Sequence, residues 1–202
     1  MTATIEPLRD FVREMTRIVE KHRDEDAILA AAKPALARLL ADDAWLPDEF
    51  AKPDPQRYCQ YLLHCDPHER FSVVSFVWEP GHRTPIHNHT VWGLVGVLRG
   101  AERCQPYEKR ASRYVPVGEP VVNQPGDIEA VSPDLGDVHV VSNALPDRTT
   151  VSIHVYGANI GAVRRSVFDA ETGQEKAFVS GYSSARLPNL WDRSEQVRAA
   201  LK

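Results

Sequence analysis

From residue 58 onward the chain is a succession of short segments rich in Val, Tyr, Phe and Trp. Such residues favour strands, and Pro-Gly pairs such as Pro80-Gly81 and Pro125-Gly126 mark turns between them. Many short strands at this spacing predict an antiparallel sandwich or barrel rather than a parallel sheet. The expected strands are Tyr58–Leu63, Phe71–Trp78, Trp92–Leu98, Val121–Asn123, Val138–Ser142 and Thr150–Tyr156.

The first 52 residues have a different pattern. Apolar residues from Leu8 to Val19 recur at steps of three and four, which predicts one face of a helix. A second helical stretch begins near Asp24 or Asp26, either of which suits an N-cap, and Pro34 predicts a break into two short helices. A short helix is also predicted from Ser194 to Lys202. Without repeats or a linker, residues 1–202 are expected to form one domain, with a helical cap (1–52) and a mainly β part with a C-terminal extension (53–202).

Charge and cysteine content exclude several classes of protein. The net charge is −4 with no basic run, which argues against a nucleic-acid partner. No apolar stretch approaches the length of a membrane helix, and the first 25 residues lack the apolar region of a signal peptide. The odd number of cysteines, three, without a Cys-x-x-Cys pair, fits a reducing compartment, so a cytoplasmic protein without a membrane partner is expected. The sequence does not specify an oligomeric state.

Histidines provide the candidate chemistry. His87 and His89 are separated by one residue, so on a strand both imidazoles would point to the same face and could chelate one metal. His139 and His154 lie on later apolar strands. Taken alone, the His-x-His pair would fit two surface histidines on a loop equally well.

The surroundings of the pair favour the metal site. Gly81 is followed after five residues by His87-Asn88-His89, after three more by Gly93, and after six more by Gly100. This spacing resembles the first cupin motif. Where many cupins place a glutamate ligand, this chain has Gly93.

A second stretch resembles the second cupin motif, with one residue added on each side of the proline. Gly126 is followed by Pro133, Gly136, His139 and Asn143. The two resemblances together imply a single cupin domain of mainly β structure, a small jelly-roll-like β-barrel. They also imply a metal site with three neutral ligands, His87, His89 and His139.

Another motif narrows the resemblance to thiol dioxygenases of the cysteine dioxygenase type. Ser152, His154 and Tyr156 alternate along one expected strand and therefore face the same side. They match the Ser-x-His-x-Tyr triad of that family, in which the tyrosine hydroxyl lies beside iron. The resemblance implies an Fe(II) cofactor, with a small-molecule thiol and O2 as reactants.

The expected substrate follows from the branch that the chain resembles. Gln60 stands where animal cysteine dioxygenases have an arginine, and Gly93 where they have the cysteine of a Cys–Tyr cross-link. The chain is thus similar to the bacterial glutamine-type branch, associated with 3-mercaptopropionate, in which an arginine after the triad holds the carboxylate. Arg165 is favoured for this role and Arg164 is the alternative. L-cysteine as substrate, a cupin isomerase or carbon-oxygenating enzyme, and a non-catalytic ligand-binding cupin are the rival interpretations.

Overall fold

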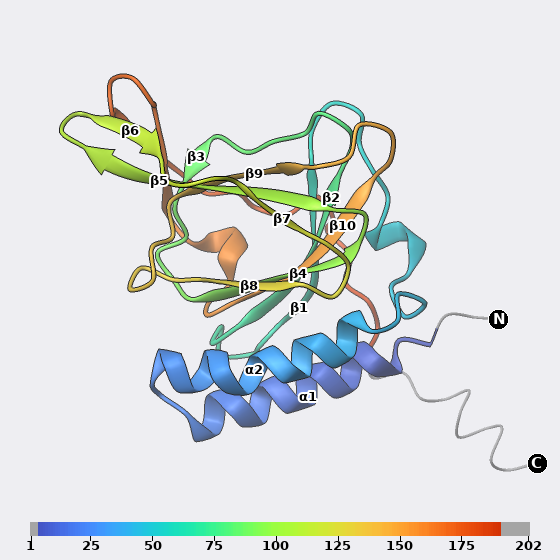
Figure 1. Ribbon diagram of the computed structural model, residues 1–202. Coiled ribbons are helices and arrows are strands. Elements are labelled where there is room, and N and C mark those ends of the chain that lie inside the picture. Colours follow the sequence, from blue (N-terminus) through green and yellow to red (C-terminus); the bar gives the residue numbers. More distant parts are fainter. Residues whose placement is uncertain (1–3, 191–202) are drawn as a thin grey trace, which may run out of the picture.

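The computed structural model describes residues 4–190 (Figure 1). The helix predicted for Ser194–Lys202 lies outside these residues. Two α-helices, α1 (Glu6–Lys21) and α2 (Glu25–Leu40), precede the strands, and two short 3₁₀ helices are η1 (Asp48–Phe50) and η2 (Ile160–Ala162). The strands are β1 (Cys59–Cys65), β2 (Ser72–Trp78), β3 (Ile86–His87), β4 (Gly93–Arg99), β5 (Glu102–Arg110), β6 (Arg113–Pro116), β7 (Val121–Asn123), β8 (Ile128–Val131), β9 (His139–Asn143), β10 (Thr150–Tyr156), β11 (Arg165–Phe168) and β12 (Glu175–Phe178).

The strands form two antiparallel sheets. One has the order β1-β2-β10-β4-β8, and the other has the order β12-β11-β3-β9-β5-β6, with β7 paired to β5. The mainly β fold with an N-terminal helical pair is therefore confirmed, as is its cupin class. The predicted barrel is not closed, because no strand pairing among the described residues joins the two sheets.

The five-stranded sheet is covered on both faces, which explains why every residue of β2 and β10 is buried. Val73 and Val77 contribute to the core under the helices, whereas the alternating residues Val74 and Phe76 belong to a second core with Tyr156. A strand with two buried faces is expected to be almost continuously apolar. Polar side chains on such a strand, such as those of Ser152 and His154, therefore need partners inside the protein.

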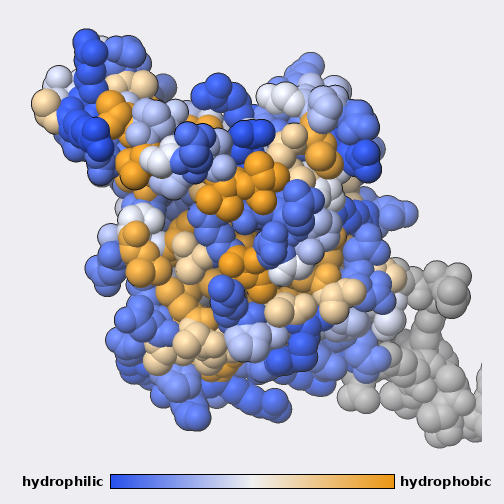
Figure 2. Space-filling view, in the orientation of Figure 1, coloured by the Kyte–Doolittle hydropathy of each residue, from blue (hydrophilic) through white to orange (hydrophobic). Residues whose placement is uncertain are grey.

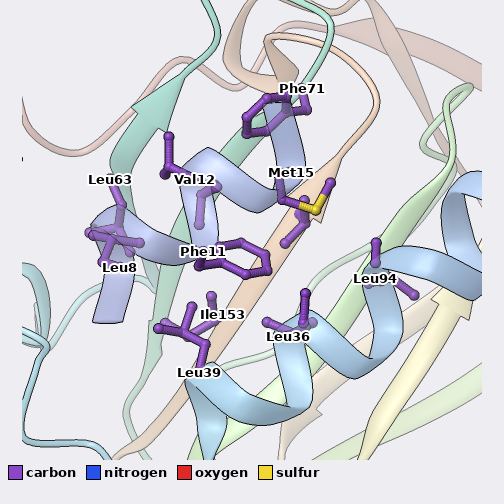
Figure 3. Packing of buried hydrophobic residues seen from close by; sticks show 14 of the residues in the cluster. Leu8, Phe11, Val12, Met15, Leu36, Leu39, Leu63, Phe71, Leu94 and Ile153 are labelled. Atoms are coloured by element: carbon purple, nitrogen blue, oxygen red, sulfur yellow. The ribbon is translucent and has the colours of Figure 1, made fainter. Parts of the chain in front are cut away.

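Helices α1 and α2 pack along the outer face of this sheet (Figures 1 and 3). Phe11 and Met15 of α1 and Leu36 of α2 point toward Ile153 of β10 in the shared core, where all four are at most 3% exposed (Figure 3). Burying each such side chain stabilises the fold by roughly 1.5–3 kcal/mol. This packing leaves the inner face of the sheet to the functional site.

The predicted break at Pro34 is wrong, because α2 runs continuously from Glu25 to Leu40. Its N-cap is Asp24, whose carboxylate accepts a hydrogen bond from the Ala27 amide at 2.9 Å. Pro34 lies on the exposed side of the helix, and so does Ala30, whose carbonyl loses its helical partner. Water can solvate that carbonyl, and the buried residues on either side of Pro34 keep the helix in register.

The surface is mostly polar over the helices, while apolar groups gather in the middle of the face drawn in Figure 2. Strand β7 contributes two exposed apolar residues, Val121 (52% exposed) and Val122 (39%). The three cysteines, Cys59, Cys65 and Cys104, are free. Within residues 4–190, no helix has the length and apolar character needed to span a membrane.

Candidate active site

Three buried histidines, His87, His89 and His139, lie close together on one face of the second sheet. His87 of β3 pairs directly with His139 of β9, which puts both side chains on one face of the sheet. His89 lies just beyond the end of β3, so the strand alternation considered for His87 and His89 does not apply to it. The three ring centroids are 4.9 Å apart in every pairing, so the imidazoles form an equilateral triangle.

Contacts outside the triangle orient the rings. Nδ1 of His87 lies 3.1 Å from the Pro85 carbonyl, and Nδ1 of His139 lies 3.3 Å from the sulfur of Cys104. Each Nδ1–H can donate outward, which leaves the Nε2 lone pair free to face the triangle. Asp137 holds the loop that follows β3. Its carboxylate accepts hydrogen bonds from the backbone amides of His89 and Thr90 at 2.7 and 2.9 Å.

These residues fit a metal ion. Their ligand atoms all lie within 4.8 Å of one another. Nδ1 of His89 and Nε2 of His139 are buried without a hydrogen-bond partner, a costly arrangement that a bound cation would relieve. Burial lowers the pKa of His87 to about 4 and holds the pKa values of His89 and His139 well below the usual range. All three imidazoles are therefore neutral near pH 7, the form that binds metals.

The inner face of β10 supplies a hydrogen-bonded row beside the triangle. Nε2 of His154 lies 2.8 Å from the Ser152 hydroxyl, and its Nδ1 lies 2.8 Å from the Tyr156 hydroxyl. The Tyr156 ring stacks on that of His89 with centroids 5.5 Å apart. The alternation predicted from the sequence thus brings the three side chains together next to the candidate metal ligands.

Gly93 leaves space that Tyr156 fills. A Cβ added at Gly93 would lie 2.7 Å from Cδ1 of Tyr156 and 3.0 Å from a methyl carbon of Val131. Either a glutamate ligand or a cysteine at this position would require the tyrosine ring to move. The candidate metal site therefore consists of three neutral imidazoles without a carboxylate from this position, and the residue beside Tyr156 has no sulfur.

We expect no cysteine–tyrosine cross-link at Tyr156. The nearest candidate by position, Gly93, has no side chain, and the free cysteines occupy other strands. Intact mass and peptide mapping of protein purified after turnover should give the unmodified Tyr156 peptide. A loss of two hydrogens mapped to Tyr156 and any cysteine would contradict this expectation.

A cavity of about 270 Å³ opens from the histidines. Among its described lining residues are two cations, Arg165 and Lys176, and no Asp or Glu. Arg165 is 5% exposed and forms no ion pair within residues 4–190; its Nε has no hydrogen-bond partner. The guanidinium packs 4.8 Å from the centroid of the Phe178 ring. A buried cation without an anion is unfavourable, so the cavity is suited to an anionic ligand.

The strand register explains why Arg165 rather than Arg164 enters the cavity. Val167 of β11 pairs with His87, and Arg165 lies two residues away, so its side chain points to the same face. Arg164 points to the opposite side and is exposed.

Ser180 connects the two predicted substrate-binding residues. Its hydroxyl accepts hydrogen bonds from Nη2 of Arg165 at 2.7 Å and from the side-chain amide of Gln60 at 2.8 Å. The same amide also donates to the Gly181 carbonyl. Gln60 thus lies in the cavity wall beside Arg165.

Several residues of the site were not predicted from the sequence. They are Asp137, Cys104, Ser180 and Glu102, the last of which is hydrogen-bonded to the Ser152 hydroxyl. No sequence signal distinguished Glu102 from the other acids of the β region, such as Glu108 and Glu129.

The fold and the buried histidine triangle define a cupin protein with a candidate metal centre. The profile of the family cysteine dioxygenase type I matches residues 4–169. The chain belongs to this family, which consists of iron enzymes, and it is accordingly a thiol dioxygenase, an oxidoreductase that acts on a small-molecule thiol and O2.

Solved structures with similar folds are more distant. An uncharacterized conserved protein with a double-stranded β-helix domain from Klebsiella pneumoniae is 18% identical, with 66% of this chain and 92% of that chain covered and a TM-score of 0.44. A cupin 2 domain-containing protein from Halorhodospira halophila is 17% identical (60% and 75% covered, TM-score 0.44). A cupin superfamily protein from Desulfitobacterium hafniense is 10% identical (54% and 84% covered, TM-score 0.41).

Proposed function

We propose that the enzyme oxidises 3-mercaptopropionate to 3-sulfinopropionate. The reaction is RSH + O2 → RSO2H, in which both oxygen atoms pass to sulfur. The observation that carries the proposal is Arg165, a buried cation that has no anionic partner within residues 4–190 and that faces the same cavity as the histidine triangle. A substrate that spans the two needs a thiol at one end and a carboxylate at the other.

His87, His89 and His139 would hold Fe(II). Fe(II) held there would supply a positive centre that favours the thiolate form of the substrate and the redox chemistry for O2. Three neutral imidazoles would leave a ferrous ion with its full positive charge, which would favour an anionic sulfur. The protein's own contribution is to orient the substrate and to keep solvent away from the sulfur.

Arg165 would bind the carboxylate through charge-assisted hydrogen bonds. Ser180 fixes the guanidinium from one side and the Phe178 ring supports it from another. Tyr156, at the end of the hydrogen-bonded row on β10, would present its hydroxyl to the bound reactants.

The amino group of L-cysteine would find no anionic partner. Two cations and no acid line the described cavity, so an ammonium there would be repelled and poorly solvated. L-cysteine is therefore the second candidate substrate, disfavoured but not barred by size. An isomerase or a ligand-binding cupin would have no need of the Ser152–His154–Tyr156 row.

The experiment is anaerobic loading with Fe(II), followed by O2 uptake with 3-mercaptopropionate, L-cysteine and cysteamine. We expect the highest kcat/KM with 3-mercaptopropionate, one O2 consumed per thiol, and a sulfinate product. An equal or higher kcat/KM with L-cysteine would contradict the substrate assignment while leaving the thiol dioxygenase class intact.

A further inference from the structure

Glu102 is a buried acid that has no role in the reaction proposed above. It lies on β5, is 1% exposed, and its Oε2 is 2.7 Å from the Ser152 hydroxyl. It lies at the end of the row on β10 that is farthest from Tyr156. The carboxyl therefore adds a fourth member to the chain of hydrogen bonds from Ser152 through His154 to Tyr156.

The donor and acceptor capacity of the Ser152 hydroxyl couples the members of this chain. Its hydroxyl has three partners: the Trp78 indole at 3.2 Å, Glu102 at 2.7 Å and His154 at 2.8 Å. A hydroxyl donates one hydrogen bond and accepts two. The indole can only donate, so of the two remaining partners one must donate to Ser152 and the other must accept from it.

Two arrangements satisfy this rule when His154 is neutral. If Glu102 is protonated, it donates to Ser152, Ser152 donates to Nε2 of His154, and Nδ1–H of His154 donates to the Tyr156 oxygen. The Tyr156 proton is then free to point into the cavity. If Glu102 is ionised, every bond reverses: Ser152 donates to Glu102, His154 donates through Nε2, and Tyr156 donates its proton to Nδ1. The second arrangement differs from the first by one proton, the one lost from Glu102.

We propose that Glu102 is a positioning residue that, in its protonated form, turns the Tyr156 hydroxyl proton toward the bound reactants. The inference rests on the proposed function for the role of Tyr156, whereas the link between the Glu102 proton and the direction of the chain follows from the contacts and a neutral His154. Loss of the Glu102 proton leaves Tyr156 able only to accept from the reactants, which removes its donated hydrogen bond.

The surroundings of Glu102 favour the protonated form. Burial, with a smaller contribution from the nearby Glu129, raises the pKa of the carboxyl to about 7, although hydrogen bonds from Ser152 and Trp78 oppose the shift. The other titratable groups around it are His154, whose Nε2 is 4.0 Å away, and at longer range Cys104 and Tyr156. Burial lowers the pKa of His154 to about 3, so its imidazole is neutral in both arrangements. The Glu102 carboxyl is therefore protonated below about pH 7 and ionised above it.

The first test is the pH dependence of kcat in the wild type, Glu102→Gln and Glu129→Gln. In Glu102→Gln the introduced side-chain amide can donate to Ser152 at every pH, so this variant should keep kcat at high pH, about tenfold above that of the wild type at pH 9. Glu129→Gln, the matched control, removes a neighbouring negative charge without touching Ser152. It should retain the alkaline loss and move its midpoint to lower pH. An equal alkaline loss in the wild type and Glu102→Gln would overturn the proposal.

The second test measures the direction of the hydrogen bonds between Glu102 and Tyr156 without enzyme turnover. ¹⁵N NMR of histidine-labelled protein, loaded with diamagnetic Zn(II), reports which ring nitrogen of His154 bears the proton. We expect Nδ1–H below the Glu102 titration and Nε2–H above it in the wild type, and Nδ1–H throughout in Glu102→Gln. A wild-type tautomer that stays the same across the titration would overturn the proposal. Failure of the substrate assignment would leave this result unchanged, so the two hypotheses are tested separately.

Discussion

His139→Ala should lose both iron and thiol oxidation. His139 lies opposite His87 in the strand pairing, and its unpartnered Nε2 faces the triangle, so its removal leaves two imidazoles to hold the metal. Changes in residues that merely support a metal ligand commonly cost ten- to a hundredfold in affinity or activity. Loss of a ligand should therefore reduce kcat/KM by more than about a hundredfold. Metal analysis of protein from iron-replete cells, together with O2 uptake, measures both effects.

The matched control is His68→Ala. His68 is exposed in the turn between β1 and β2, so the change removes an imidazole without touching the cavity. This variant should keep its iron and its activity. Full iron occupancy in His139→Ala would refute the three-histidine site. Zinc in the wild-type protein would not, because imidazole sites accept several divalent metals.

The strands that could be predicted from the sequence are those with buried apolar residues. Thr150–Tyr156 was predicted with the bounds that the structure has, and β2 differs by one residue; both strands are buried throughout. The exposed strand β7 (Val121–Asn123) was also predicted with its bounds, from its two β-branched residues rather than from burial. The hairpin of β5 and β6 was missed, and its outer end projects beyond the rest of its sheet (Figure 1). Its outer half, from Glu108 to Arg110, is exposed and charged, so no core imposes an apolar pattern on it.

The convergence of the predicted site residues depends on two kinds of information. The His-x-His spacing and the alternation on β10 are local, so the sequence was sufficient to group those side chains. Glu102 and Ser180 reach the site through contacts with residues 50 and 120 positions away. Such contacts are set by how the sheets pack, and no short-range pattern in the sequence encodes them.

Arg165→Ala should reduce kcat/KM for 3-mercaptopropionate about a hundredfold. Hydrogen bonds to charged groups contribute about 1.5–3 kcal/mol each, and each 1.4 kcal/mol corresponds to roughly a factor of ten. The guanidinium is buried, and its Nε lacks a partner, so the carboxylate of the substrate would gain contacts that water cannot fully replace. Cysteamine has a thiol but no carboxylate, so its kcat/KM should change by less than about threefold. Steady-state O2 uptake with both thiols measures the difference.

Two further variants separate charge from position. Arg165→Lys keeps the positive charge but loses the planar fork that binds a carboxylate through two parallel hydrogen bonds, so it should recover only part of the lost kcat/KM. Arg164→Ala removes the neighbouring guanidinium, which is exposed on the opposite side of β11, and should leave both substrates unaffected. If Arg164→Ala selectively lost kcat/KM for 3-mercaptopropionate, Arg164 would bind the carboxylate, and our assignment of Arg165 would be wrong. Equal losses for 3-mercaptopropionate and cysteamine in Arg165→Ala would mean that Arg165 supports the cavity wall, through Ser180 and Gln60, rather than binding the substrate.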